Sequence, residues 1–281
     1  MDAVARSYKT SDGVRLHYWD AGEGSPLVFL PGWSQTAAMF RGQFELAENY
    51  RCLALDWRGH GESDKPATGY RHARLAKDLL EWLTALELDE VTIVAHSMGC
   101  KVVWNYWELF GASPVKRLIV VDQSPRLVSA PSWSDTEIAQ YGATTTPEEL
   151  EVFLEQLSGV DGEAVTRRFV PTMFTPAIAS ETLEWVIAEN LKMPRKYAAF
   201  LLRETMYSDS RDILPRIGWP TLVVSGEGSH VPTSALRWTQ QQIPHSRFAS
   251  IAANEGGSHF CFLENSAAFN QILQGFLAET R

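Results

Sequence analysis

The sequence predicts an α/β protein in which helices flank a mostly parallel sheet and an all-helical insertion interrupts it. Two observations lead to this expectation. Short apolar runs, typical of buried parallel strands, alternate with segments of helical periodicity. This alternation stops near residue 128 and resumes near residue 210, and the segment between shows helical patterns only. We therefore expect a core domain from residues 1–127 and 211–281 and a helical cap from residues 128–210.

The expected strands are short and mostly apolar. Residues 14–22 alternate apolar and polar side chains, as a half-buried strand does. Residues 25–32 form an apolar run that ends at Pro-Gly, which is typical of a buried parallel strand. Similar patterns predict strands at residues 50–59, 91–97, 115–124, 219–229 and 247–260.

The expected helices show apolar residues at helical spacing or a recognisable start. In residues 72–88 the apolar positions on one helix face are Leu75, Leu79, Leu80, Leu83 and Leu86. Residues 145–157 open with Thr-Pro and a Glu-rich first turn, which is typical of a helix N-terminus. Helical patterns also cover residues 37–49, 98–111, 163–174, 179–206 and 267–280.

Composition and charge exclude several classes of protein. Hydrophobic residues make up 45% of the chain and charged residues 21%, which is ordinary for a globular domain with a full core. The formal net charge of −9 argues against a nucleic-acid partner and against attraction to an anionic membrane. The first residues lack the pattern of a signal peptide, and no apolar stretch reaches the roughly 18 residues of a membrane span. We expect a cytoplasmic protein.

The cysteine pattern excludes common metal and redox sites. Cys52, Cys100 and Cys261 are scattered and odd in number, and no Cys-x-x-Cys pair occurs. We therefore expect free thiols in an intracellular chain, with neither a zinc site nor a redox dithiol.

The segment VAHSMGC, residues 94–100, carries the strongest chemical signal. A buried strand leads straight into a helix, so the side chain at the corner, Ser97, projects above the carboxyl edge of the sheet. The small residues Ala95 and Gly99 let strand and helix approach closely, which matches a nucleophile elbow with Ala in place of its first Gly. The N–H of Met98 then points to where an oxyanion would develop. An ordinary helix cap is the plain alternative for Ser97.

A serine nucleophile needs a base, and His259 is the strongest of seven histidines. It follows the last expected strand on a Gly-rich loop, NEGGSHF, whose glycines would let the loop curl over Ser97. His96, although adjacent to Ser97, is expected to point elsewhere and to pack.

The base needs a carboxylate to orient it, and the sequence offers two. Asp122 ends the apolar run LIVVDQ, at the carboxyl edge where sites of α/β proteins form. Glu227, in the turn after the next core strand, is the competing acid. We favour Asp122 and keep Glu227 as the alternative.

The loop after the first core strand, LPGWSQ, is expected to supply a second oxyanion donor. Gly32 permits the turn, and the N–H of Trp33 is the candidate donor. The polar loop DWRGHGES contains Asp56 and His60, whose residue types look catalytic. We interpret it as a scaffold that braces neighbouring loops through hydrogen bonds.

With Ser97, Asp122 and His259 in this chain order, the sequence resembles the α/β-hydrolase fold superfamily. The resemblance covers nearly the whole chain and rests on the segments LPGW, DWRGHGES, VAHSMG, PTLVVSGE and GGSHFCFLEN. It implies an eight-stranded, mostly parallel sheet, a helical cap inserted after the sixth strand, and a catalytic triad. The sequence departs from the family at Ala95 in the elbow and at Ser229, where the family mostly has the acid, which shifts weight to Asp122.

Within the superfamily, the resemblance implies more than one function. The segments DQSPR and GEGSHVP look like those of esterases, perhydrolases and non-haem haloperoxidases, which favours a hydrolase of a small, apolar ester or lactone. The segments GWSQ, DWRGHG and HSMGC also resemble cofactor-independent quinolone 2,4-dioxygenases. There His259 and Asp122 would act as the base while Ser97 binds substrate. Neither function needs a metal or another cofactor. A ligand receptor on the same fold is the third hypothesis, and a homo-oligomer stays open.

Overall fold

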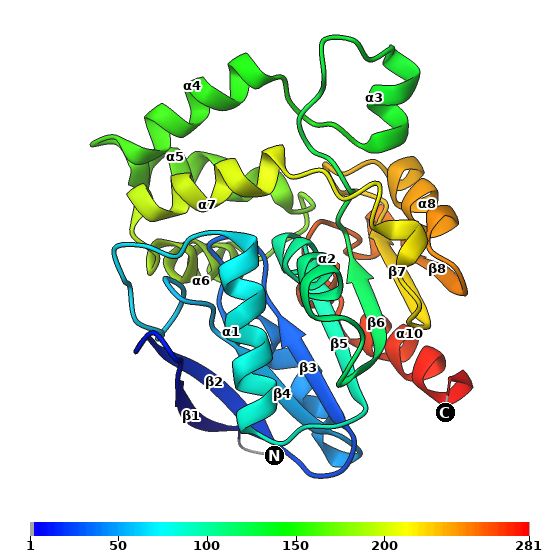
Figure 1. The fold of residues 1–281 in the computed structure, drawn as a ribbon. Helices are drawn as coiled ribbons and strands as arrows, with labels where there is room; N and C mark the ends of the chain where they lie inside the picture. The colour runs from blue at the N-terminus through cyan, green and yellow to red at the C-terminus, as the bar shows by residue number, and fades with distance from the viewer. Residues whose placement is uncertain (1–2, 281) are drawn as a thin grey trace.

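The computed structural model describes residues 3–280, in which eight strands form one sheet (Figure 1). They span Val4–Lys9 (β1), Arg15–Ala21 (β2), Pro26–Leu30 (β3), Arg51–Leu55 (β4), Val91–His96 (β5), Val115–Val121 (β6), Thr221–Gly226 (β7) and Ser246–Ile251 (β8). Their order in space is β1-β2-β4-β3-β5-β6-β7-β8. β2 pairs antiparallel with β1 and β4, and all other neighbours pair parallel. The expected mostly parallel, eight-stranded sheet is confirmed.

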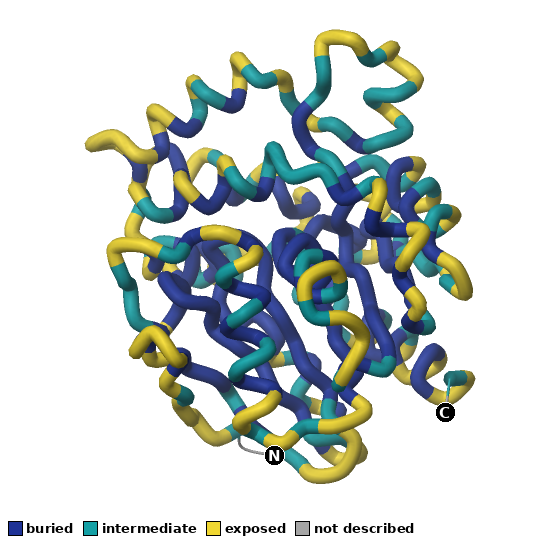
Figure 2. Tube along the Cα trace, viewed as in Figure 1, coloured by how far each residue is buried: buried dark blue, intermediate teal, exposed yellow. Residues whose placement is uncertain are grey.

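Helices pack on both faces of the sheet, which explains why the central strands are apolar throughout. Along β5, Ile93 and Ala95 join the core on one face and Val94 joins the core on the other. The first face carries α1 (His72–Ala85), α2 (Met98–Phe110) and α8 (Thr233–Gln242). The second carries η1 (Ala37–Glu48), α9 (Cys261–Glu264) and α10 (Ser266–Glu279). Short 3-10 turns form η3 (Leu214–Arg216) and η4 (Ala253–Glu255). The central strands, β3 to β7 in the sheet, are the most deeply buried part of the trace (Figure 2).

Between β6 and β7 the chain forms only helical elements, which lie over the carboxyl ends of the strands (Figure 1). These are α3 (Asp135–Tyr141), α4 (Pro147–Ser158), α5 (Gly162–Phe169), η2 (Val170–Met173), α6 (Ser180–Leu191) and α7 (Arg195–Tyr207). We call residues 128–210 the helical insertion. Its α4 begins where the sequence indicates, because Thr146 and Glu149 form a reciprocal capping box and Pro147 follows the cap. The carboxyl ends of the strands are therefore roofed by helices.

The structure differs from the sequence predictions in several elements. The helical segment expected at residues 179–206 is two helices, α6 and α7, separated by residues 192–194, because Pro194 cannot continue α6. Residues 37–49 do not form one α-helix: η1 is built of 3-10 turns with non-helical backbone at Phe40, and Gly42 lowers the helical propensity of this stretch. The edge strand β1 was missed because its six residues are mostly exposed and show little apolar alternation. The helices α3 and α8 were also missed, because α3 has no buried residue and α8 has only three.

Three further sequence predictions concern the cysteines, the chain ends and membrane spans. Cys52, Cys100 and Cys261 are free and buried, as expected. Residues 1–2 and 281, the ends of the expected core domain, lie outside the described residues. Among residues 3–280, every helix is too short or too polar to cross a membrane.

A buried lysine joins the two ends of the helical insertion to the core. Lys101, on α2, is fully buried, and its Nζ donates to the carbonyl of Pro125 at 2.5 Å and to that of Ser208 at 3.0 Å. Pro125 follows β6 at the start of the insertion, and Ser208 follows α7 at its end. Burial lowers the pKa of Lys101 to about 7, although the nearby Asp209 carboxylate opposes this shift.

This lysine predicts a pH dependence of stability. Its pKa is near 7 in the folded chain and about 10.4 in the unfolded chain, so between these values only the unfolded chain binds the proton. The free energy of unfolding should therefore rise with pH, by about 2 kcal/mol between pH 7 and pH 9. We expect Lys101→Met to lose this increase and the exposed Lys116→Met to keep it. Denaturant titrations at both pH values measure it, and equal slopes in wild type and Lys101→Met would contradict the prediction.

Candidate active site

Ser97 lies at a sharp corner between β5 and α2, as the sequence predicts. Its φ of 52° is uncommon for a residue with a side chain, and its N–H is held by the carbonyl of Val121 on β6 at 3.0 Å. The start of α2 packs closely against the end of the neighbouring strand β3, since a Cβ added to Gly99 would lie 2.7 Å from the carbonyl oxygen of Leu30. Ser97 is partly exposed while its neighbours are buried. The strained corner therefore presents the hydroxyl to solvent.

The structure brings His259 and Asp122 into direct contact. His259 Nδ1 donates to Asp122 Oδ2 at 2.7 Å, and both side chains are almost completely buried. Asp122 accepts two more hydrogen bonds, from the Gly226 N–H at 3.1 Å and from the Ser229 hydroxyl at 2.5 Å. Since a carboxylate oxygen accepts from all three donors, Asp122 fixes the His259 tautomer with the proton on Nδ1.

The alternative acid lies elsewhere. Glu227 is exposed, and its carboxylate accepts a hydrogen bond from the Ser250 hydroxyl at 2.8 Å. Among the described residues, Asp122 is the carboxylate that pairs with His259. The shorter aspartate at the end of β6 thus takes the position beside the histidine.

The glycines before His259 allow its loop to fold tightly against the ends of β7 and β8. A Cβ on Gly257 would lie only 1.9 Å from the carbonyl oxygen of Ile251, and the Gly257 carbonyl accepts the Gly228 N–H at 2.7 Å. The His259 N–H donates to the carbonyl of Met173, in the helical insertion, at 3.2 Å. Both the core and the insertion therefore set the position of the histidine.

The two expected N–H donors flank Ser97. A Cβ on Gly32 would lie 2.9 Å from the Cβ of Ser97, so the loop of residues 31–36, which we call the oxyanion loop, presses against the serine. The N–H of Trp33 in this loop has no hydrogen-bond partner among the described residues. Met98 begins α2, and N–H groups in the first turn of a helix have no partner within it. Both N–H groups are available to an anion beside Ser97.

The polar loop after β4 braces the oxyanion loop. The Ser34 N–H donates to His60 Nε2 at 3.1 Å, and the Ala37 N–H donates to the Asp56 carboxylate at 2.7 Å. His60 is fully buried, and burial lowers its pKa to about 4, so its ring stays neutral and can accept this bond. Asp56 and His60 thus support the oxyanion loop, and they lie apart from Ser97 and His259.

His96 links the two loops beside Ser97. Its Nε2 donates to the backbone carbonyl of His259 at 2.8 Å, and its Nδ1 lies 2.8 Å from Oε1 of Gln35. Gln35 Oε1 in turn accepts the Gly32 N–H at 3.1 Å. Complete burial and the nearby His259 hold the pKa of His96 well below its ordinary value. His96 packs, as expected, and it also lies between the oxyanion loop and the loop that carries His259.

An apolar cavity opens beside His259. His230 stands on its wall with its ring 4.6 Å from the His259 ring, and burial lowers the pKa of His230 to about 3. His230 is exposed although protein surrounds it, because its open side faces the cavity. The volume is about 510 Å³, and the lining is mainly Leu127, Leu150, Phe153, Phe169, Leu202 and Met206. Phe169 contacts the Trp33 ring, with centroids 6.2 Å apart, so the cavity reaches toward the oxyanion loop.

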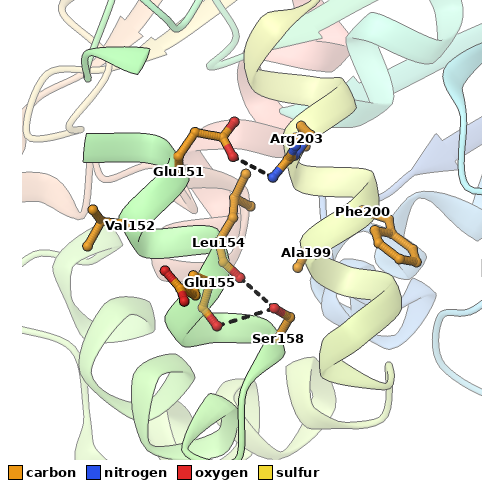
Figure 3. Close-up of a pocket in the computed structure, with 8 residues that line it drawn as sticks. All are labelled: Glu151, Val152, Leu154, Glu155, Ser158, Ala199, Phe200 and Arg203. Carbon is orange, nitrogen blue, oxygen red and sulfur yellow. Dashed lines mark hydrogen bonds and ion pairs between the residues drawn. The ribbon is translucent and has the colours of Figure 1, made fainter. Parts of the chain in front are cut away.

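Another hollow lies between α4 and α7, and it holds none of the predicted site residues (Figure 3). Glu151 and Arg203 face each other across it as an ion pair, and the Ser158 hydroxyl donates to the carbonyl of Leu154 on the same helix. Its volume is about 290 Å³. Among residues 3–280, no group of three or more His, Cys, Asp or Glu side chains is arranged to hold a metal ion.

Sequence reasoning missed some residues of this site. Ser229 was noted only as a departure from a family pattern, and it contributes a hydrogen bond to Asp122. His230 and Gln35 were not singled out, because an isolated histidine or glutamine in a loop has no distinguishing pattern. Their contacts arise when segments far apart in the chain meet.

Comparisons with known proteins show similarity in sequence and in fold. The family model described as "alpha/beta hydrolase fold" matches residues 25–160. The non-heme chloroperoxidase CPO-A1 of Kitasatospora aureofaciens is 30% identical over 286 residues, covering 95% of this chain and 98% of that protein. A soluble epoxide hydrolase of Corynebacterium sp. (strain C12) is 38% identical over 120 residues, 42% of each chain.

Solved structures share the arrangement of the whole chain. The esterase EaEST of Exiguobacterium antarcticum superposes with a TM-score of 0.88 at 26% identity, covering 98% of this chain and all of that one. The bromoperoxidase of Bacillus anthracis gives the same TM-score at 24% identity, with the same coverage. The second likeness shows the fold alone.

The close contact at the elbow predicts opposite effects for two glycine substitutions. Gly99→Ala should destabilise the protein by about 2–4 kcal/mol, because the methyl group would press on backbone oxygens that cannot move aside. Gly275→Ala, in the exposed interior of α10 with no atom nearby, should stabilise it by about 0.5–1 kcal/mol. Unfolding in urea measures both, and an unaffected Gly99→Ala would refute the proposed close packing.

Proposed function

Because the chain belongs to the α/β-hydrolase fold superfamily, we propose that it is a serine hydrolase that cleaves a carboxylic ester or lactone of a small, apolar compound. The observation that carries the proposal is the 2.7 Å hydrogen bond from His259 to the buried Asp122, at the same sheet edge as the partly exposed Ser97. A base with an oriented carboxylate behind it and a strained serine corner is the arrangement that acyl transfer needs.

In the first half of the reaction, Ser97 Oγ attacks the carbonyl carbon of the substrate. His259 takes the hydroxyl proton on Nε2, since Nδ1 already donates to Asp122. The negative charge that develops on the carbonyl oxygen is accepted by the N–H groups of Trp33 and Met98, and each such donor contributes roughly 10²–10³ in rate. Collapse of this intermediate expels the alcohol, which receives the proton from His259, and leaves an acyl group on Ser97.

In the second half, water replaces the alcohol. His259 deprotonates the water, which attacks the acyl carbon, and the proton passes to Ser97 as the acid leaves. Asp122 stays ionised throughout and stabilises the imidazolium form of His259 in both halves. No metal or redox group takes part in this scheme.

The cavity beside His259 suggests the substrate class. Its wall is mainly aliphatic and aromatic, and its volume of about 510 Å³ lies in the usual range for a small-molecule site. We assign it to the apolar part of the ester. Most of its lining comes from residues 128–210, so the helical insertion acts as the cap of the site, over a core of residues 1–127 and 211–281. The substrate is a small, uncharged molecule.

A cofactor-independent dioxygenase is the second candidate function. The observation that favours it is that His259 and Asp122 are paired while Ser97 makes no side-chain hydrogen bond to another described residue. In that reaction His259 would remove a proton from a hydroxyl of an N-heteroaromatic ring, and Ser97 would only bind the substrate. The two functions therefore differ in whether Ser97 is needed for chemistry.

Replacing the serine separates these functions. We expect Ser97→Ala to lower the turnover of a short-chain aryl ester by roughly 10⁴-fold or more, because the nucleophile is lost while the donors remain. A fluorophosphonate should add its mass to the wild type and leave Ser97→Ala unmodified, as read by intact-protein mass spectrometry. Oxygen uptake with a hydroxyquinolone that persists in Ser97→Ala, without ester turnover in the wild type, would support the dioxygenase instead.

Two amide substitutions test which acid orients the base. Asp122→Asn should lower kcat by roughly 10⁴-fold, because the amide cannot hold His259 in the required tautomer or stabilise its charged form. Glu227→Gln should stay within about 2-fold of wild type, because this exposed carboxylate contacts Ser250. Ester turnover at saturating substrate measures both. The opposite ranking would move the acid from Asp122 to Glu227.

A further inference from the structure

The oxyanion loop is hydrogen-bonded to the helical insertion at three residues. The Trp33 indole N–H donates to the carbonyl of Ala198 at 2.7 Å. The Ser34 hydroxyl donates to the carbonyl of Asn190 at 2.8 Å, and the Thr36 hydroxyl donates to the Glu189 carboxylate at 2.7 Å. All three acceptors lie in residues 189–198, where α6 ends and α7 begins, which we call the α6–α7 corner. The loop thus rests on this corner.

Arg195 is the central group of the α6–α7 corner. Its Nη2 donates to the Ser34 hydroxyl at 2.9 Å and, by a short bond, to the carbonyl of Asn190. Its Nη1 donates to the Thr166 hydroxyl of α5 at 3.1 Å, and its Nε donates to the carbonyl of Met193 at 3.0 Å. A single guanidinium therefore joins α5, both helices of the corner and the oxyanion loop.

This guanidinium has no ion-pair partner among the described residues. Burial lowers its pKa to about 10, and the Glu163 carboxylate only partly opposes this shift. The Arg195 side chain is half-buried, and even partial burial of a cation without a carboxylate beside it costs free energy. A neutral side chain would hold the helices at a smaller cost, so the position of the charge calls for another explanation.

That explanation lies in the strained backbone at Ser34. Its φ of 56° is uncommon for a residue with a side chain, and such a conformation persists only when surrounding contacts hold it. His60 holds the Ser34 N–H from the core, while Arg195 and the carbonyl of Asn190 hold the Ser34 hydroxyl from the insertion. The Ser34 backbone follows directly on Trp33, whose N–H is the proposed oxyanion donor. Holding Ser34 therefore sets the direction of that N–H.

We propose that Arg195 is a positioning residue for the oxyanion hole, acting through Ser34 on the N–H of Trp33. The inference rests on the proposed hydrolase function. It also gives the α6–α7 corner a fixed role, as a support of the catalytic loop. The guanidinium contacts the oxyanion loop directly at the Ser34 hydroxyl, so its effect on the oxyanion hole passes through Ser34.

The test compares Arg195→Met and Arg195→Lys with wild type on p-nitrophenyl butyrate. We expect kcat to fall roughly 10–100-fold in Arg195→Met, less than the loss of a whole donor, while KM changes by less than about 3-fold. The affinity for an aryl trifluoromethyl ketone, which forms a tetrahedral anion on the serine, should fall by the same factor as kcat. Arg195→Lys should restore part of both, because it keeps the charge and loses the fork of donors.

A matched control lies on the same helix. Arg203 is exposed on α7 and pairs with Glu151 of α4, so Arg203→Met should leave kcat and inhibitor affinity unchanged. Where Arg195→Met does not fold, Ser34→Ala decides, since it removes the same hydrogen bond from the other side and should show the same loss.

The outcomes separate this inference from the proposed function. Suppose that the wild type turns over the ester and that Arg195→Met and Ser34→Ala keep the same kcat and inhibitor affinity. That result would overturn the role of Arg195 and leave the hydrolase function intact. An increase in KM with unchanged kcat would likewise overturn the positioning role and make Arg195 a substrate contact. Wild type that neither turns over esters nor reacts at Ser97 with a fluorophosphonate would overturn the hydrolase and the inference together.

Discussion

The hydrogen bonds to the Asp122 carboxylate are the interactions on which the rest of the site depends. The carboxylate closes the end of β6 and accepts hydrogen bonds from the end of β7, from the loop that follows it and from His259. A buried carboxylate is stable as an anion only with such donors, so the segments that supply them must converge on it. The convergence in turn fixes the histidine in one tautomer. One buried carboxylate therefore specifies both the local fold of three segments and the tautomer of His259.

Around this anion the polar groups of the site come from the ends of strands, from loops and from the helical insertion. His96 lies between the loop that carries His259 and the oxyanion loop. His60, in the core, holds the oxyanion loop through the Ser34 N–H. Burial lowers the pKa of both histidines, so each ring stays neutral and adds no positive charge near His259. The helical insertion contributes in the same way through Arg195 and the carbonyl of Met173. The position of the reactive groups is thus shared between the core and the insertion, which argues for a preorganised site.

Much of this arrangement could be predicted from local sequence patterns. Ala95 and Gly99 indicate the close corner at Ser97, because only small residues let a strand and a helix meet. The glycines before His259 indicate a tightly curled loop, and Asp122 follows an apolar strand at the edge where sites form. The sequence patterns failed to predict elements that bury few apolar residues or depart from regular geometry. The exposed β1 and α3 bury little, so neither shows an apolar period, and η1 departs from helical geometry at Phe40 in a segment with helical spacing.

By itself, the sequence determined the α/β class, the segment that carries Ser97 and the two acids that compete for the base, since each follows from the residues within a few positions. Only the tertiary structure decided between Asp122 and Glu227, because that choice depends on which carboxylate reaches the His259 ring across 137 and 32 residues of chain, respectively. The same holds for Arg195, whose partners lie on α5, on the α6–α7 corner and in the oxyanion loop. Local spacing encodes elements and turns, whereas contacts between distant segments exist only once the sheet and its insertion have packed.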